Sequence, residues 1–367
     1  MIPYGRQHLD QNDVQAVRKV LMSDFLTQGP KIKEFEKTLC HYTGARYAVA
    51  AANGTAALHL SYLAANIGGG DEVITTPNTF VATTNMLLAV GAKPVFCDIR
   101  LDTYNIDEGK IEKLITSKTR AIVAVHFAGQ PCAMRKILKL AKKYKLIVIE
   151  DAAHALGAVC NGKKIGSLNS DMTTFSFHPV KSITTGEGGA VLTDNPDYYK
   201  KLILLRSHGI EKDAHGFNVM SQLGYNYRLT DIQAALGISQ LKKLDAFIAR
   251  RKRVAKWYQE ELGNGRGIFL PSASDESAWH IYVVRVKNGK LRILLAEYLK
   301  ENGIATNFHY PAVYGQPYYK GHGFARVHLK NMEEYQKTCV TLPCYPQLTH
   351  REVKIISDKI KVFLEKT

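Results

Sequence analysis

An aspartate and a lysine follow two short runs of apolar and β-branched residues. Asp151 ends the run LIVIED, and Lys181 lies in 175-FSFHPVKSITTGEGGA-190. Because strand ends of a sheet meet at one edge, we expect the carboxylate and the amine to come together. Pyridoxal phosphate needs such a pair, a lysine to bond it as a Schiff base and a carboxylate to keep its pyridine nitrogen protonated. The same lysine could also move a proton as a general base.

Position alone leaves an alternative open. A strand-terminal aspartate such as Asp151 often caps the helix that follows, here over 152–158, and Lys181 could be a surface lysine. The glycine-rich stretch 184-TTGEGGAV-191 favours the cofactor site, because glycine allows tight turns and close approach of the backbone to a ligand.

A third anchor precedes these two in the chain. The segment 53-NGTAALHLSYLAA-65 follows a strand-like run and opens a helix-like one. The first amides of such a helix, with the hydroxyl of Thr55, could hold a phosphate at the positive helix terminus. Asn-Gly-Thr is also an ordinary turn and cap, so it counts only together with Asp151 and Lys181.

The elements that must position these residues alternate along the chain. Six β-branched runs, separated by helical patterns, lie at 47–53, 72–77, 94–99, 121–127, 146–151 and 172–178. This alternation predicts an α/β fold with a mostly parallel sheet, helices on both faces, and ligands outside the carboxyl ends of the strands. After 188–194 the pattern predicts one long helix or two abutting ones over 230–262, capped by Thr230.

A stretch rich in Gly, Ser and Pro at 263–277 predicts a domain boundary. We expect a large cofactor-binding domain over 1–262, with 1–30 at the edge of the active site, and a small α+β domain over 263–367. The elements expected in the small domain are strands over 280–286 and 304–310 and helices over 292–302 and 351–367.

The composition limits the partners. The chain has 367 residues, 46% hydrophobic and 22% charged, as in compact soluble proteins. Its 49 Lys+Arg against 33 Asp+Glu give a formal charge of +16, which suits nucleic acid, anionic membranes or phosphorylated small molecules. Nucleic-acid-binding signatures and apolar runs of bilayer length are both absent from the sequence, so we expect neither partner and place the protein in the cytoplasm. The six cysteines lack metal-ligand spacing, and we expect no metal.

Together these segments resemble the DegT/DnrJ/EryC1/StrS family of sugar aminotransferases, which are fold type I pyridoxal-phosphate enzymes. The resemblance spans essentially the whole chain. Its segments are 24-DFLTQGP-30, 53-NGTAAL-58, 77-PNTFVAT-83, 149-IEDAAHALGA-158, 174-TFSFHPVKSITTGEGGA-190, 206-RSHGI-210 and 224-GYNYRLTDIQAALG-237.

The resemblance implies that Lys181 forms the Schiff base and that Asp151 faces the pyridinium. The other cofactor contacts that it implies are Gly54, Thr55, Phe80, His154, Ser176 and, from the neighbouring subunit, Asn226. A homodimer with shared active sites is therefore expected. Core positions remain the alternative for Phe80 and His154, and the roles of His178 and Glu187 stay open.

Within the family, segments such as 308-FHYPAVYGQPYYKGHGF-324 resemble the transaminases of pseudaminic acid biosynthesis. This implies transfer of the amino group of L-glutamate, through pyridoxamine phosphate, to C4 of a UDP-linked 4-keto-6-deoxy-N-acetylhexosamine. The product would be UDP-4-amino-4,6-dideoxy-N-acetyl-β-L-altrosamine. The candidate substrate contacts are Gln28, Arg228, His309, Tyr310 and Tyr314. A short polar stretch at 207–224, where relatives often carry a longer loop, leaves local contacts open.

Three other functions compete with this one. A dTDP- or GDP-linked keto-sugar would need the same chemistry and a different nucleotide pocket. In the sugar 3-dehydratase branch of the family, histidine replaces the lysine, so Lys181 argues against it. A non-catalytic regulator that binds nucleic acid would suit the charge and would need no catalytic lysine.

Overall fold

The structure, a computed structural model, describes residues 1–263 and 267–366, and a seven-stranded sheet lies at its centre. From one edge to the other the strands are β1 (Tyr47–Ala51), β9 (Gly189–Thr193), β8 (Met172–Ser176), β5 (Ile147–Asp151), β4 (Thr119–Val125), β2 (Glu72–Thr75) and β3 (Lys93–Phe96). Strand β9 is antiparallel to both neighbours, and all other pairs in this sheet are parallel. The predicted fold class is confirmed, and each of the six predicted runs overlaps one strand.

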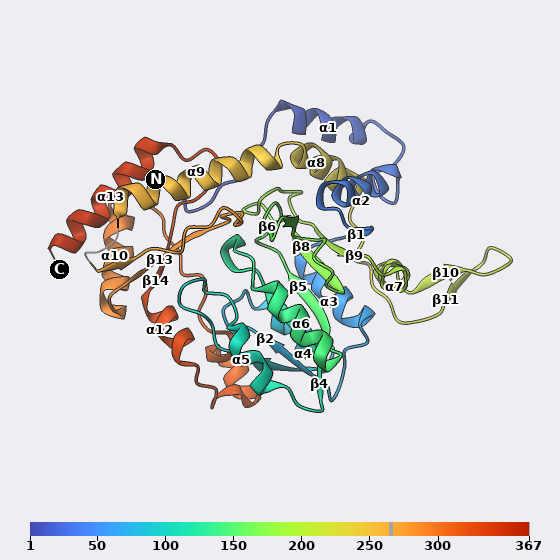
Figure 1. Ribbon diagram of the computed structural model, residues 1–367. Coiled ribbons are helices and arrows are strands. Elements are labelled where there is room, and N and C mark those ends of the chain that lie inside the picture. The colour runs from blue at the N-terminus through green and yellow to red at the C-terminus, as the bar shows by residue number, and fades with distance from the viewer. Residues whose placement is uncertain (264–266, 367) are drawn as a thin grey trace.

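Helices cover both faces of this sheet. Figure 1 shows α6 (Met134–Tyr144) on one face, with α3 (Gly54–Ala64) and α4 (Ala82–Ala89) on the other. Helix α6 buries Met134, Ile137 and Ala141, spaced by three and four positions, so one stripe faces the sheet and its lysines face solvent. Helix α3 is buried along most of its length because it contacts β8, β9, α4 and α7 (Pro196–Arg206).

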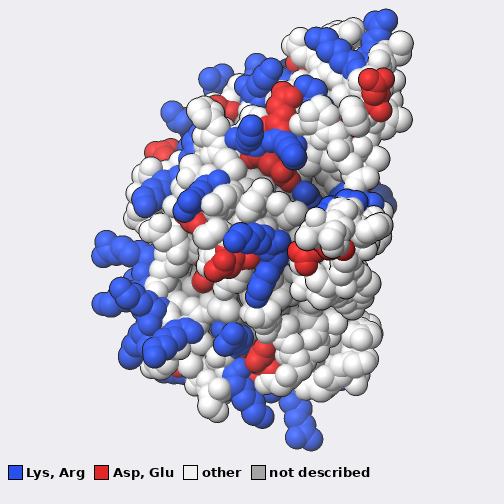
Figure 2. Space-filling model, turned by 90° about the vertical axis from the view of Figure 1, so that its right-hand side faces the viewer, with Lys and Arg blue, Asp and Glu red and all other residues white. Residues whose placement is uncertain are grey.

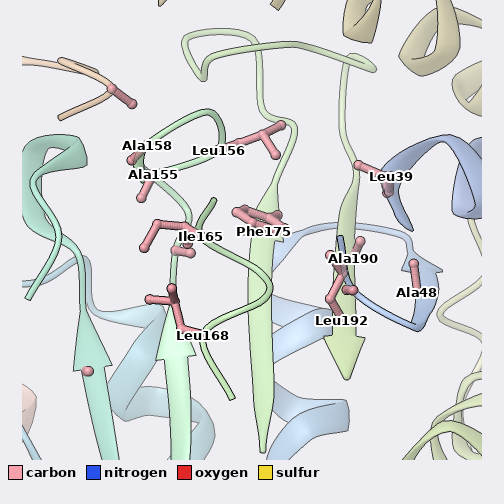
Figure 3. Close-up of a cluster of buried hydrophobic side chains, with 14 of the residues drawn as sticks. Leu39, Ala48, Ala155, Leu156, Ala158, Ile165, Leu168, Phe175, Ala190 and Leu192 are labelled. Carbon is pink, nitrogen blue, oxygen red and sulfur yellow. The ribbon is translucent and has the colours of Figure 1, made fainter. Parts of the chain in front are cut away.

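A hydrophobic cluster holds the strand that leads to Lys181. Figure 3 shows Phe175 of β8 and Leu192 of β9 beside Leu39 of α2 (Pro30–Thr43), together with side chains from the loop 155–168. Phe175 is almost fully buried, and β8 is also hydrogen-bonded to β5. The ends of β5 and β8 therefore have fixed positions relative to each other.

The C-terminal part has its own sheet and hydrophobic cluster. Two abutting helices, as predicted, lead into it: α8 (Asp231–Leu241) and α9 (Leu244–Leu262). The remaining elements of this part are strands β12 (Ile268–Phe269), β13 (Tyr282–Val286) and β14 (Cys339–Leu342) and helices α10 (Gly289–Glu301), α12 (Lys330–Thr338) and α13 (His350–Glu365). The division at residue 263 stays a prediction, and 264–266 of the expected boundary lie outside the described residues.

One predicted strand is wrong. Residues 304–310 form no ladder, because Ile304 makes a single bridge to Ile2 and Asn307 a single bridge to Thr341. This segment instead runs along the edge of the C-terminal sheet toward the large sheet. The C-terminal sheet instead consists of β12, β13 and β14, of which the sequence pattern had indicated only β13.

Shorter elements complete the described chain. These are α1 (Gln11–Leu21), α5 (Glu108–Ile111), α11 (Pro317–Tyr319), β6 (Val159–Cys160), β7 (Lys163–Lys164), β10 (Ile210–Lys212), β11 (Asn218–Met220), the 3-10 turns Glu112–Leu114, Phe127–Gly129 and Val313–Gly315, and the π turn Lys320–Phe324. The hairpin of β10 and β11 projects from the body of the molecule (Figure 1).

Positive side chains are dispersed on one face of the molecule. On the face from which the hairpin projects, Lys and Arg side chains lie among acidic ones and among uncharged surface (Figure 2). Of the helices in the described ranges, none combines the length and the apolar character needed to cross a bilayer.

The predicted cap of α8 can be tested by mutation. The Thr230 hydroxyl accepts a hydrogen bond from the Gln233 amide, and the Gln233 side chain accepts one from the Thr230 amide, which is a capping box. We expect Thr230→Ala to lower the free energy of unfolding by about 1 kcal/mol in denaturant titrations. Ser117→Ala, at an exposed position, is the control, and an equal effect of both changes would contradict the assignment.

Candidate active site

A cavity of about 1000 Å³ opens at the carboxyl ends of the parallel strands. Val125 at the end of β4, Asp151 at the end of β5 and Ser176 at the end of β8 line it. This is the edge at which parallel sheets bind ligands. The segment 307–311 from the C-terminal part closes the opposite side, so the cavity lies between the two sheets.

Asp151 is buried at the floor of this active-site cavity. Its Oδ2 accepts a hydrogen bond of 2.6 Å from the Thr83 hydroxyl, and its Oδ1 accepts one of 3.2 Å from the Ala153 amide. Residues 152–158 form turns, so the alternative that Asp151 caps a helix there is wrong. Within the described chain Asp151 has no ion-pair partner, which leaves its charge available for a cationic group in the cavity.

Lys181 lines the same cavity, as the spacing of the two residues predicted. Burial lowers the pKa of its amine to about 8, although the negative charge of Asp151 acts in the opposite direction. An amine with this pKa is partly unprotonated near neutral pH, which is the form that attacks a carbonyl. The geometry and the pKa therefore suit a lysine that bonds a carbonyl-bearing cofactor.

The start of α3 forms a cradle beside these two groups. Asn53 caps the helix by accepting a 2.8 Å hydrogen bond from the Ala56 amide, and Gly54 and Thr55 line the cavity. A Cβ on Gly54 would lie 2.8 Å from the Cβ of Ser176, so only glycine lets the helix terminus come this close to β8. The helix amides and the Thr55 and Ser176 hydroxyls are suitable donors for a phosphate.

An exposed aromatic side chain also lines the cavity. Phe80 is 59% exposed and lines the cavity, so it is not a core residue. Its ring centroid lies 6.2 Å from that of Tyr310. The phosphate cradle, the amine, the carboxylate and an exposed aromatic face thus fit the parts of pyridoxal phosphate.

His154 is both buried and part of the cavity wall. Its Nδ1 accepts a 3.2 Å hydrogen bond from the Ala128 amide, and its Nε2 lies 3.3 Å from the Tyr310 hydroxyl oxygen. Burial holds its pKa well below the usual value for histidine, and the charge of Lys181 lowers it further. The imidazole is therefore neutral at physiological pH.

The C-terminal part contributes two of the expected substrate residues, His309 and Tyr310. His309 Nδ1 lies 2.9 Å from the Thr341 hydroxyl, and burial lowers its pKa to about 4. His280, two residues before β13, also lines the cavity but was not among the expected site residues. Its position in the segment 278-AWHIYV-283 was the sequence signal that could have indicated a site residue. Thr83, which fixes Asp151, was likewise missed within 77-PNTFVAT-83.

Four expected contacts lie outside the cavity that this chain forms. Gln28 is exposed, Arg228 is half-buried, and Tyr314 packs against Phe96 with ring centroids 5.8 Å apart. Asn226 is exposed between Tyr225 and Tyr227, whose rings stack on each other. Their roles stay predictions, and the role of Asn226 would require a neighbouring subunit.

His178 and Glu187 line the cavity, but their contacts do not assign them a role. The described residues hold no group of three or more His, Cys, Asp or Glu side chains arranged to bind a metal.

Comparison with known proteins assigns the family. The sequence model of the DegT/DnrJ/EryC1/StrS aminotransferase family matches residues 7–361. The chain belongs to this family. The resemblance seen in the sequence motifs is thereby confirmed.

Other DegT/DnrJ/EryC1/StrS members are similar over their full lengths. A Campylobacter jejuni protein named UDP-4-amino-4,6-dideoxy-N-acetyl-beta-L-altrosamine transaminase is 40% identical, with 100% of this chain and 98% of the relative covered. The structure of Helicobacter pylori PseC, an aminotransferase involved in the biosynthesis of pseudoaminic acid, has a TM-score of 0.95 at 36% identity over 100% of both chains.

The cofactor follows from the same comparison. Bacillus subtilis NtdA, solved with bound PMP, has a TM-score of 0.89 at 32% identity, with 97% of this chain and 83% of that chain covered. Like other DegT/DnrJ/EryC1/StrS members, this protein is a pyridoxal-phosphate-dependent sugar aminotransferase.

The pKa of Lys181 gives a pH dependence that can be measured. In protein freed of cofactor, labelling of Lys181 by an amine reagent should rise with a midpoint near pH 8, because only the unprotonated amine reacts. Asp151→Asn removes the charge that raises this pKa, so its midpoint should lie lower. Peptide mass spectrometry across pH would report both midpoints, with surface lysines as internal controls. A midpoint for Lys181 equal to theirs would contradict the assignment.

The cradle at Gly54 can be tested by filling it. A Cβ there meets Ser176, so we expect Gly54→Ala to weaken binding of pyridoxal phosphate about 5-fold or more, because overpacking costs about 1–3 kcal/mol. Gly69→Ala is the matched control, because a Cβ at Gly69 meets open space. Fluorescence titration of the cofactor measures both affinities, and unchanged binding by the Gly54 variant would remove the cradle from the site.

Proposed function

We propose that the protein transfers the amino group of L-glutamate to C4 of a UDP-linked 4-keto-6-deoxy-N-acetylhexosamine. The product would be UDP-4-amino-4,6-dideoxy-N-acetyl-β-L-altrosamine, the compound in the name of the C. jejuni relative. The observation that carries an aminotransferase function is the placement of the Lys181 amine and the Asp151 carboxylate in one cavity. Its volume of about 1000 Å³ leaves room for a sugar beside the cofactor.

The chain's own groups divide the work between binding and proton transfer. When bound, pyridoxal phosphate supplies an electron sink and carries the amino group between donor and acceptor. Asp151, anchored by Thr83, holds a negative charge where a pyridinium would lie. Lys181, with a pKa of about 8, can accept and return a proton near neutral pH. Gly54, Thr55 and Ser176 would hold the phosphate.

We also infer a homodimer with shared active sites. Large apolar side chains are exposed near the projecting hairpin and after α1, including Phe217 at 70% and Met22 at 82%. Exposed apolar groups of this kind favour an interface between subunits. Such a partner would bring a second copy of exposed residues such as Asn226 toward the cavity. The cytoplasmic location remains a prediction.

The proposal sets the result of one substrate assay. Purified protein should release 2-oxoglutarate from L-glutamate with the UDP-linked 4-keto sugar, and much more slowly with dTDP- or GDP-linked 4-keto sugars. Lys181→Ala should abolish turnover and the visible absorbance of the bound cofactor, because Lys181 is the one lysine among the described residues that line the cavity.

Two results would change the proposal. Turnover with only a thymidine or guanosine sugar would replace the UDP-sugar with that substrate. Binding of duplex DNA with a steep salt dependence, and without any turnover, would support the regulatory alternative instead.

A further inference from the structure

A strained loop points a backbone amide at His154. Ala128, which follows β4, has a φ of +57°, a left-handed conformation that alanine rarely adopts. Its amide donates to His154 Nδ1, while its carbonyl oxygen accepts a 2.9 Å hydrogen bond from the His280 amide. The next carbonyl, of Gly129, accepts a 3.0 Å hydrogen bond from the Ala278 amide. Residues 278 and 280, which precede β13, therefore hold the loop in place through these hydrogen bonds. A strained backbone conformation persists when its surroundings restrain it in this way.

This amide fixes the tautomer of His154. A nitrogen that accepts a hydrogen bond carries no proton, so a neutral imidazole has its proton on Nε2. Burial, together with the nearby Lys181 and His309, keeps the ring neutral by holding its pKa well below the usual value. His154 Nε2 is therefore a hydrogen-bond donor, and the atom that it faces, at 3.3 Å, is the Tyr310 hydroxyl oxygen.

The orientation of the Tyr310 hydroxyl follows. Its oxygen accepts from His154, so its own proton must point elsewhere, and Tyr310 lines the active-site cavity. Burial and the charge of Asp151 raise its pKa above the usual value, so the hydroxyl keeps its proton. The ring lies edge-on to Phe127, and the Tyr310 amide donates to the Asn78 side chain at 3.3 Å. The site thus contains an oriented, protonated hydroxyl.

We propose that Tyr310 is a catalytic residue, the hydrogen-bond donor to the ketone oxygen of the keto substrates, and that Ala128 and His154 are positioning residues for it. This inference rests on the proposed function. Amination of a ketone replaces the C=O bond with a C=N bond and releases water, whose two hydrogens come from the attacking amine. The oxygen gains negative charge before it leaves, and a preorganised donor stabilises that charge. Tyr310 keeps its proton throughout.

The test distinguishes a role at the ketone oxygen from a role in the proton transfer that Lys181 carries out. With L-glutamate in D₂O, exchange of the Cα hydrogen requires no ketone oxygen, whereas release of 2-oxoglutarate does. Tyr310→Phe in the holoenzyme should retain Cα exchange within about 3-fold and lose about 100-fold in the rate of 2-oxoglutarate release and in kcat with the keto-sugar. Equal losses in exchange and release, or none in either, would overturn the inference.

The control and a second measurement keep the outcome clear. Tyr282→Phe removes a buried hydroxyl that has no hydrogen-bond partner among the described residues, so both of its rates should match wild type. ¹⁵N NMR of histidine-labelled protein should show His154 as the neutral Nε2–H tautomer at pH 6.5, the usual pKa of histidine, and an Nδ1–H form or a cation would overturn the inference even if Tyr310→Phe does not fold. Wild-type protein that exchanges no Cα hydrogen would overturn L-glutamate as donor and leave the tautomer result to decide the role of Tyr310.

Discussion

The site depends on an amine and a buried carboxylate that line one cavity. Removing Lys181 from water disfavours its charged form, and Asp151 offsets only part of that effect, which places the pKa near 8. This balance requires that neither group find another ion-pair partner and that both stay fixed. Hydrogen bonds from Thr83 and Ala153 fix the carboxylate, and the parallel pairing of β5 with β8 fixes the chain that leads to the lysine.

Close approach of backbones is the second constraint. Gly54 lies against Ser176, and a Cβ on Gly189 would lie 2.5 Å from the Asn53 carbonyl oxygen. Both glycines let the start of α3 lie over the ends of β8 and β9. The helix terminus and the strand ends can then donate hydrogen bonds to one anion, which longer side chains would have held apart.

Local patterns in the sequence indicated the strands of the large sheet and placed the central pair at one edge of it, but they left the role of that pair open. Strand runs such as 146–151 carry their own signal, and Asp151 and Lys181 follow from where those runs end. The failures involve contacts between distant segments. Residues 304–310 have the composition of a strand but lack a neighbour with which to pair, and β14 became a strand because β13 lies beside it. Thr83 and His280 lie in motifs that the sequence showed, but tertiary packing brings them to the cavity, and the motifs alone did not reveal that.

Helix α9 joins the two cores of the molecule. Ile248, in its first turns, packs in the cluster under the large sheet, whereas Val254 and Tyr258 belong to the cluster of the C-terminal sheet. One continuous helix thus connects both halves. Arg251, buried between these positions, donates hydrogen bonds to the carbonyl oxygens of His280 and Cys344. A wide hinge motion between the two halves would have to bend α9 and break those hydrogen bonds. We therefore expect the two halves to keep their relative positions while sugars enter and leave through the mouth of the cavity.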